Sequence, residues 1–257
     1  MPTRDDAPIG APIWIDLFTS DTDASRAFYG ALFGWSADEP NPDFGGYFNF
    51  TLDGAPVAGA MHNDGSAGTP DAWSVYLATA DARATADAAV AAGAQVVVPA
   101  MDVGALGTMA VLVDPTGAAI GMWQPGEHRG FGALARTGVP AYFELHTRDL
   151  DGAVAFYRDV FGWQPEVMSD TPEFRYVRYR GGDDPLAGIM DGTAHLPADV
   201  PAHWAVYFQV DDAGASVAQA VTLGGSVVHA AEVTPFGTLA TLTDPTGAMF
   251  RLVQQPT

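Results

Sequence analysis

Four residues in the second half of the chain have side chains that could carry chemistry, namely Tyr142, Glu144, His146 and His203. The first three alternate along a segment with the pattern of a β-strand, so they point to one face. Carboxylate and imidazole groups on one face are the ligands that many divalent ions require. His203 opens another predicted strand and could complete such a site. A single histidine is more often a hydrogen-bonded structural residue, and this alternative stays open.

The chain is a tandem repeat of two halves. The first half offers a weaker set of such side chains, Asp16 and His62. The repeated strings are separated by about 130 residues. They begin at Ile13 and Ala141, Ala27 and Ala155, Trp73 and Trp204, and Gly107 and Gly237. Equivalent positions of the two halves can therefore be compared directly.

Each half has the pattern strand–helix–strand–strand–strand twice, with aspartates at helix starts and glycines at helix ends. The sequence predicts an α+β fold of four βαβββ modules. We expect a first domain over residues 1–126, a linker over 127–139 and a second domain over 140–257. The clearest predicted strands cover 13–19, 46–52, 56–62, 73–79, 141–147, 174–180, 186–191 and 203–210, and the predicted helices end near 33, 92, 161 and 223.

Two repeated strings indicate structure and no activity. The Phe-Tyr and Phe-Gly-Trp segments at 28–35 and 156–163 place aromatic residues on one apolar helical face, which is typical of a core. The Asp-Pro-Thr-Gly strings at 114–117 and 244–247 satisfy the geometry of a tight turn.

Composition excludes several classes of protein. Thirty-one acidic residues against 11 lysines and arginines give a formal charge of −20, so nucleic acids and anionic membranes are poor partners. The chain has no cysteine, which rules out thiolate ligands and nucleophiles. With neither a signal-peptide pattern nor a long apolar run, we expect a cytoplasmic protein.

These modules, with their Ala-Phe-Tyr helix and late Asp-Pro-x-Gly turn, resemble the vicinal oxygen chelate superfamily. That group includes glyoxalase I, extradiol dioxygenases and bleomycin-resistance proteins, and the resemblance covers residues 12 to 254 or so. It is strongest for two-domain actinobacterial members, some of which are similar to proteins of aromatic polyketide biosynthesis. The resemblance implies two cup-shaped mixed sheets that hold a ligand or a metal.

Enzymes of this superfamily bind a divalent ion through three strand residues, and the resemblance allows those positions to be counted here. The counted positions lack the usual histidine, glutamate or glutamine ligands, so we expect no metal and no cofactor. We also expect Arg251 to meet Glu144, because a buried guanidinium needs a partner. The counted residues are Trp14, Ser74 and Gly121 in the first half, and Tyr142, Ala205 and Arg251 in the second.

Aromatic and methionine side chains occupy many of the predicted cup positions, which suits a flat apolar ligand. For Phe48, Phe50, Phe174 and Tyr176 the sequence does not decide which face of the sheet they take. The predicted ligand-binding residues are Trp14, Asp16, Phe18, Phe48, Met61, Met109, Trp123, Tyr142, Glu144, His146, Tyr207 and Arg251.

The leading hypothesis is a metal-free protein that binds a hydrophobic aromatic compound in natural-product biosynthesis, resistance or detoxification. In the first half we expect Trp14 to stack on the ligand and Asp16 to be its main polar contact. The alternative is a glyoxalase-like lyase, a dioxygenase or a hydroxylase with an atypical site. We expect a monomer or a weak homodimer, with His128, His195 and His229 facing water.

Overall fold

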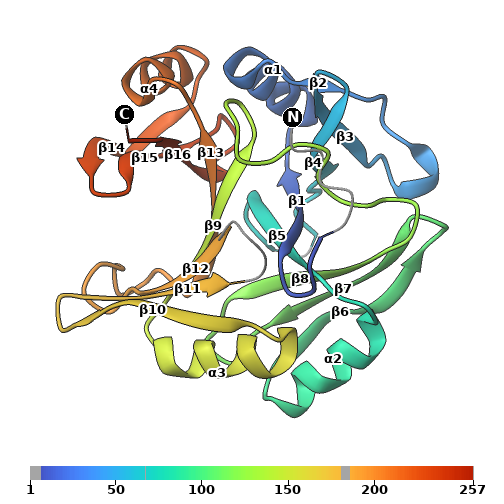
Figure 1. Cartoon of the computed structure of the whole chain (residues 1–257). Coiled ribbons are helices and arrows are strands. Elements are labelled where there is room, and N and C mark those ends of the chain that lie inside the picture. Colours follow the sequence, from blue (N-terminus) through green and yellow to red (C-terminus); the bar gives the residue numbers. More distant parts are fainter. Residues whose placement is uncertain (1–6, 67, 181–185, 257) are drawn as a thin grey trace.

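The computed structural model describes residues 7–66, 68–180 and 186–256, which form two eight-stranded mixed sheets, one from each half (Figure 1). In the first half the elements are β1 (Pro12–Thr19), α1 (Thr22–Phe33), β2 (Ser36–Ala37), η1 (Pro42–Phe44), β3 (Phe48–Leu52), β4 (Ala55–His62), β5 (Ala72–Ala78), α2 (Ala82–Ala91), β6 (Gln95–Val103), β7 (Gly107–Val113) and β8 (Ala119–Pro125). In the second half they are β9 (Pro140–Thr147), α3 (Leu150–Phe161), β10 (Gln164–Thr171), β11 (Phe174–Arg180), β12 (Ala187–Asp191), β13 (His203–Gln209), α4 (Ala213–Thr222), β14 (Ser226–Thr234), β15 (Gly237–Thr243) and β16 (Met249–Gln254).

The strand order confirms the predicted tandem βαβββ modules. The first sheet runs β2-β3-β4-β1-β5-β8-β7-β6, and the second repeats that order with β10-β11-β12-β9-β13-β16-β15-β14. Each sheet joins its two modules through an antiparallel pair, β1 with β5 or β9 with β13. The sheets are cup-like and open, so each has one concave face.

Helix ends follow the sequence signals. The Asp21 side chain accepts the amide of Ala24 at the start of α1, and Gly34 ends that helix with φ of 76°. Only glycine takes such a conformation at little cost. Asp149 and Gly162 do the same for α3.

The helices pair across the two halves, α1 with α4 and α2 with α3 (Figure 1). The helix-side faces of both sheets meet in one core, where the Phe208 ring lies 5.0 Å from Phe33 and 5.5 Å from Trp73. In β1, Ile13, Ile15 and Leu17 belong to this buried face. Because strand residues alternate, the even-numbered residues of β1 point to the concave face on the outer side.

The repeated structural strings form a hydrogen-bonded tie between the halves. Tyr29 of α1 donates to Asp244 Oδ2 at 3.0 Å, while Tyr157 of α3 donates to Asp114 Oδ2 at 2.8 Å. Each tyrosine also accepts an indole N–H, from Trp73 or from Trp204. The aspartates of the Asp-Pro-Thr-Gly turns therefore hold the opposite half as well as their own turn.

The segment between β8 and β9 packs against the first half. Phe131 donates its amide to Ile13 O at 3.1 Å, and its ring lies 5.4 Å from Trp14. His128 meets the Trp14 ring edge-on at 4.4 Å. The expectation that His128 faces water is therefore wrong, and burial lowers its pKa to about 4. His195 and His229 are exposed, as predicted.

Within the described ranges, no helix is both long enough and apolar enough to cross a membrane.

Candidate functional site

Each concave face has a buried carboxylate near its centre, and we call the two faces the first cup (β1 to β8) and the second cup (β9 to β16). Asp16 occupies the first cup and Glu144 the second, each only 8% exposed. They stand at equivalent strand positions, since Asp16 pairs with Gly59 and Glu144 with Gly188. The cups therefore share one design, and their neighbours decide their chemistry.

In the first cup, the carboxylate is surrounded by donors from its own sheet. Asp16 Oδ1 accepts the Trp14 indole N–H at 3.0 Å and the Tyr47 hydroxyl at 2.8 Å. The same indole N–H also lies 2.8 Å from the Tyr47 oxygen. Burial raises the pKa of Asp16, and the hydrogen bonds from Tyr47, Tyr76 and Trp14 offset only part of that effect.

In the second cup, the carboxylate meets tyrosines and cations. Tyr176 donates to Glu144 Oε2 and Tyr207 to Oε1, both at 2.8 Å. Nη1 of Arg251 lies 2.6 Å from the Tyr207 hydroxyl and 3.5 Å from Glu144 Oε1, which confirms the predicted Arg251–Glu144 contact. Burial is the largest influence on the pKa of Glu144 and raises it. His146, Arg251 and Tyr207 together outweigh it and bring the pKa to about 2.

Two histidines stand beside that carboxylate. His146 is 2% exposed, and its Nε2 lies 2.7 Å from Glu144 Oε1. His203 is the direct cross-strand partner of His146, and the two rings stack with centroids 5.2 Å apart and planes at 7°. Glu144, His146 and His203, which the sequence left open as one possible site, thus lie together in the second cup.

Comparison with known proteins places this arrangement in a family. The model of the Glyoxalase/Bleomycin resistance protein/Dioxygenase superfamily matches residues 12–122 and 140–252, which is most of the chain. The chain belongs to this superfamily.

Relatives that match almost the whole chain come from actinobacteria. "Putative glyoxylase CFP32" of Mycobacterium bovis is 39% identical over 259 residues, covering 99% of this chain and 98% of the relative. "Anthracycline biosynthesis protein DauV" of Streptomyces sp. (strain C5) is 40% identical over 266 residues, covering 95% and 93%. The Mn(II)-bound glyoxalase from Novosphingobium aromaticivorans shares the fold, with a TM-score of 0.66 and 18% identity over 96% of this chain and 82% of that one.

The superfamily's metal raises the question of whether this chain has donors for it. Strand register corrects the counted middle position: Tyr76, and not Ser74, pairs with both Trp14 and Gly121. In the second sheet Tyr207, and not Ala205, pairs with Tyr142 and Arg251. The middle positions counted from the sequence were therefore wrong by two residues in each half.

The side chains at the corrected positions of the two sheets do not suit a metal ion. An indole N–H, a glycine and a guanidinium supply no lone pair, and burial raises the pKa of the Tyr76 and Tyr207 phenols far above their ordinary value. No group of three or more histidine, aspartate or glutamate side chains suited to an ion occurs among the residues that the structure describes. No step is therefore assigned to a metal.

One predicted ligand-binding residue faces the wrong side. The Phe48 ring lies 4.2 Å from the Arg26 guanidinium carbon of α1, so Phe48 belongs to the helix-side core, as does Phe50. Phe174 and Tyr176 take the concave face, where their rings stack at 5.6 Å. By strand alternation and register, the concave faces carry the other predicted residues: Trp14, Asp16, Phe18, Met61, Met109 and Trp123 in the first cup, and Tyr142, Glu144, His146, Tyr207 and Arg251 in the second.

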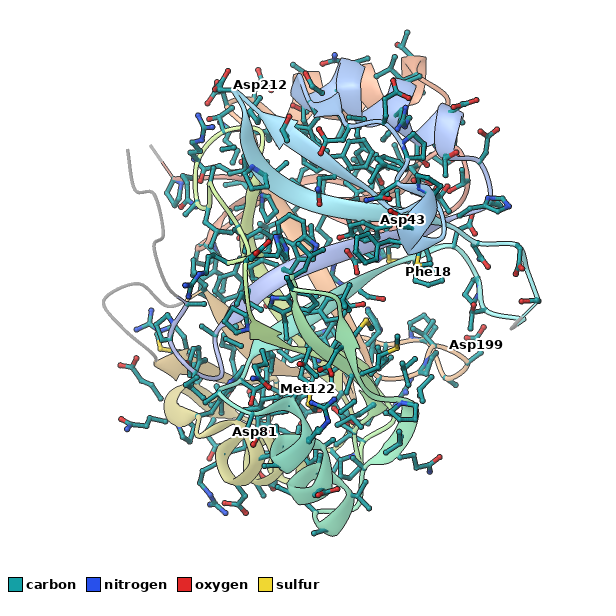
Figure 2. All side chains as sticks on the ribbon, turned by 90° about the vertical axis from the view of Figure 1, so that its right-hand side faces the viewer. Phe18, Asp43, Asp81, Met122, Asp199 and Asp212 are labelled. Carbon is teal, nitrogen blue, oxygen red and sulfur yellow. The ribbon has the colours of Figure 1, made fainter. Side chains whose placement is uncertain are left out.

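Figure 2 shows Phe18, in that view, below the segment of Asp43 and above the segment of Asp199. Phe18 is half-buried near the C-terminal end of β1. Its counterpart in the second cup is His146, because Phe18 pairs with Ala72 as His146 pairs with His203.

Tyr47 and Tyr76 are functional neighbours that sequence reasoning missed. The repeat itself contained the signal for Tyr76, because it occupies the place of Tyr207 in the string that begins at Trp73. Tyr47 corresponds to Tyr176 only by strand register, as Asn49 pairs with Gly59 where Arg178 pairs with Gly188.

Aromatic side chains also meet across the rim of the second cup. Phe174 of β11 lies 6.1 Å from Phe236, which is 57% exposed in the turn between β14 and β15. These elements lie near opposite edges of the open sheet, so the contact shows how far the sheet curls. Together with Tyr176, the pair forms an aromatic wall that we call the rim wall (Phe174, Tyr176 and Phe236).

Proposed function

We propose that the chain binds a small aromatic compound in the second cup, without a metal ion. The observation that carries the proposal is where the buried nitrogens without hydrogen-bond partners lie. Among the described residues these are His128 Nε2, His146 Nδ1, His203 Nε2 and Arg251 Nε, besides the His146 nitrogen that contacts Glu144. Three of these four residues belong to the second cup.

Such nitrogens favour a polar ligand. A buried donor or acceptor left without a partner costs about 1–3 kcal/mol. A compound with oxygen substituents that reaches these nitrogens would recover that free energy. The rim wall beside them offers flat aromatic surface, which suits a planar ring. Oxygenated aromatic rings combine both properties.

The proposal moves the ligand away from the first cup, where we expected Asp16 to be its main polar contact. Asp16, Trp14 and Tyr47 satisfy one another by hydrogen bonds. His128 and Phe131 also contact the Trp14 ring. The first cup therefore offers a polar ligand group fewer free hydrogen-bond partners than the second cup does.

A relative's name adds support for the ligand class. DauV is named for anthracycline biosynthesis, and anthracyclines are flat, oxygenated polycyclic compounds. We propose a related role here, in the biosynthesis of an aromatic natural product or in resistance to one. The formal charge of −20 argues against nucleic acid and anionic membranes as partners.

A second candidate function is an enzyme of the lyase or oxygenase type. It is favoured by the 2.7 Å contact between His146 and Glu144, because an imidazole held by a carboxylate can accept a proton from a bound compound. Turnover of a bound compound would distinguish this candidate from simple binding.

Equilibrium dialysis against 2,6-dihydroxyanthraquinone, a flat oxygenated probe, tests the binding proposal. We expect saturable binding that survives treatment of the protein with a chelator. Phe174→Ala should weaken it, because the variant removes part of the rim wall. Its control is Phe44→Ala, in the segment before β3 of the first sheet, which should leave the affinity unchanged. Absence of saturable binding, or equal loss in both variants, would contradict the proposal.

A further inference from the structure

The two stacked histidines of the second cup have fixed proton positions. Nδ1 of His203 lies 3.0 Å from the Pro201 carbonyl oxygen. A carbonyl oxygen can only accept, so Nδ1 carries the proton. Nε2 of His146 lies 2.7 Å from the ionised Glu144 carboxylate. A bare lone pair would be repelled at that distance, so Nε2 carries the proton in His146.

The remaining nitrogen of each ring is then a bare acceptor. Burial lowers the pKa of both imidazoles, so each ring is neutral and has one unprotonated nitrogen. These atoms are Nδ1 of His146 and Nε2 of His203. Both are buried, and neither has a hydrogen-bond partner among the residues in the described ranges.

We propose that these two nitrogens form an acceptor pair that selects ligands bearing hydroxyl hydrogens, such as phenols or enols. A hydroxyl group donates to a bare imidazole nitrogen, whereas an ether or a carbonyl oxygen turns its own lone pairs toward it. This inference rests on the proposed binding of an aromatic compound in the second cup. It goes further, because it names the ligand's donor groups and the residues that recognise them.

Arg251 complements the acceptor pair. Its Nε is a buried donor without a partner in the part of the chain that the structure describes, while its Nη1 is held by Tyr207. A phenol oxygen can donate its hydrogen to an imidazole and accept from a guanidinium. The second cup thus supplies both kinds of partner that a hydroxyl group uses.

The first cup lacks this device. Phe18 and Ala72 occupy the register positions of His146 and His203, and Gly121 occupies that of Arg251. Selection for hydroxyl groups is therefore expected in the second cup alone.

A matched pair of probes tests the inference: 2,6-dihydroxyanthraquinone and 2,6-dimethoxyanthraquinone, measured below the pKa of the phenols. The two share a ring system, but only the first can donate. We expect the dihydroxy compound to bind the wild-type protein at least about tenfold more tightly, which corresponds to one or two hydrogen bonds. His146→Phe and His203→Phe should each reduce that preference. His146→Asn should retain part of it, because the amide oxygen can accept near the position of Nδ1.

Phe18→Leu, at the equivalent first-cup position, should leave the preference unchanged and serves as the control. Nitrogen-15 NMR of the free protein gives a readout that folding defects in a variant do not affect, and it should show unprotonated Nδ1 in His146 and Nε2 in His203. Equal binding of the two probes, or the opposite tautomers, would overturn the acceptor pair while leaving the proposed function standing. Failure of both probes to bind would instead overturn the proposed function.

Discussion

The first and second cups keep the same frame, and three positions near the central carboxylate differ in charge or polarity. In each, a carboxylate lies on the central strand and accepts hydrogen bonds from tyrosines of neighbouring segments. Where the first cup has small or apolar residues, the second has polar side chains that contain nitrogen. The matched pairs are Phe18 and His146, Ala72 and His203, and Gly121 and Arg251.

Those three differences reverse the direction in which the pKa of the central carboxylate is shifted. Without a cation beside it, Asp16 has a pKa raised by burial. Next to His146 and Arg251, Glu144 has a pKa of about 2, although it is equally buried. The scaffold therefore allows the pKa of the carboxylate at one position to shift in either direction, and the neighbouring side chains decide which.

The shared frame depends on a glycine opposite each carboxylate. A Cβ on Gly59 would lie 1.7 Å from the Tyr47 hydroxyl oxygen, and one on Gly188 would lie 2.3 Å from that of Tyr176. Both tyrosines reach the carboxylate through space that any larger residue would fill. Duplication preserved this geometry in both halves while the three neighbouring positions diverged.

Replacing each carboxylate by leucine should show the largest difference between the cups. Glu144→Leu leaves the Arg251 guanidinium buried without its counter-charge, which costs about 3–5 kcal/mol of unfolding free energy. Asp16→Leu removes only hydrogen-bond acceptors, and Trp14 can still donate to Tyr47, so we expect about 1–3 kcal/mol. Urea unfolding followed by circular dichroism measures both.

The double variant Glu144→Leu with Arg251→Met provides the control. Removing the charge together with its partner should recover part of the lost stability. Equal losses for the two single variants would mean that the Arg251 charge does not distinguish the cups.

The carboxylates of the two cups should change the unfolding free energy with pH in opposite directions. The pKa of Glu144 is 4.5 in the unfolded chain and about 2 in the folded protein. Its contribution, about 3 kcal/mol, is complete above 4.5 and is lost as the pH falls toward 2. Asp16 behaves oppositely: its pKa is raised, so its contribution is present below 3.8 and is lost as the pH rises through the folded value.

Glu144→Gln should therefore flatten the loss of stability between pH 4.5 and 2. Asp16→Asn should remove the gain in stability that the wild-type protein makes as the pH falls from the folded pKa of Asp16 to 3.8, and it should leave the slope below 3.8 unchanged. Unfolding free energies measured from neutral pH down to pH 2 test both slopes. A steeper loss in Glu144→Gln would show that the carboxylate is not held ionised.

The sequence predicted the fold well because the repeat displayed each signal twice. The Asp21 cap, the Gly34 stop and the alternating β1 residues act locally, and the structure confirms them. Strand β10 was not located, since most of its residues are exposed and its apolar alternation is weak. Phe48 was predicted to bind the ligand, but it shares a face of β3 with Phe50, and that face packs on α1 through Arg26 and Tyr29. Alternation along β3 groups these residues on one face but does not tell which face meets the helices.

The site was partly predictable for a similar reason. Tyr142, Glu144 and His146 follow from alternation along one strand, and Arg251 was assigned to Glu144 because a buried charge needs a partner. The tyrosines that bind the carboxylates come from other strands, and their positions depend on register. Counting along single strands could not supply that register, which also explains the middle position that was off by two residues.

Removing the hydroxyls of the tie between the halves should give the smallest and most equal effects. Tyr29→Phe and Tyr157→Phe each delete a hydrogen bond to a turn aspartate, at 3.0 Å and 2.8 Å. Both also leave an indole N–H, of Trp73 or Trp204, without its acceptor. We expect each variant to lower the unfolding free energy by about 1–2 kcal/mol.

Because both ties lie in the shared core and away from the cups, the two losses should agree within about 0.5 kcal/mol, and they should add in the double variant. Ligand affinity of the second cup should be unchanged in either single variant. A loss confined to one of them, or a drop in affinity with Tyr157→Phe alone, would show that the divergence between the halves extends from the cups into the core that joins them.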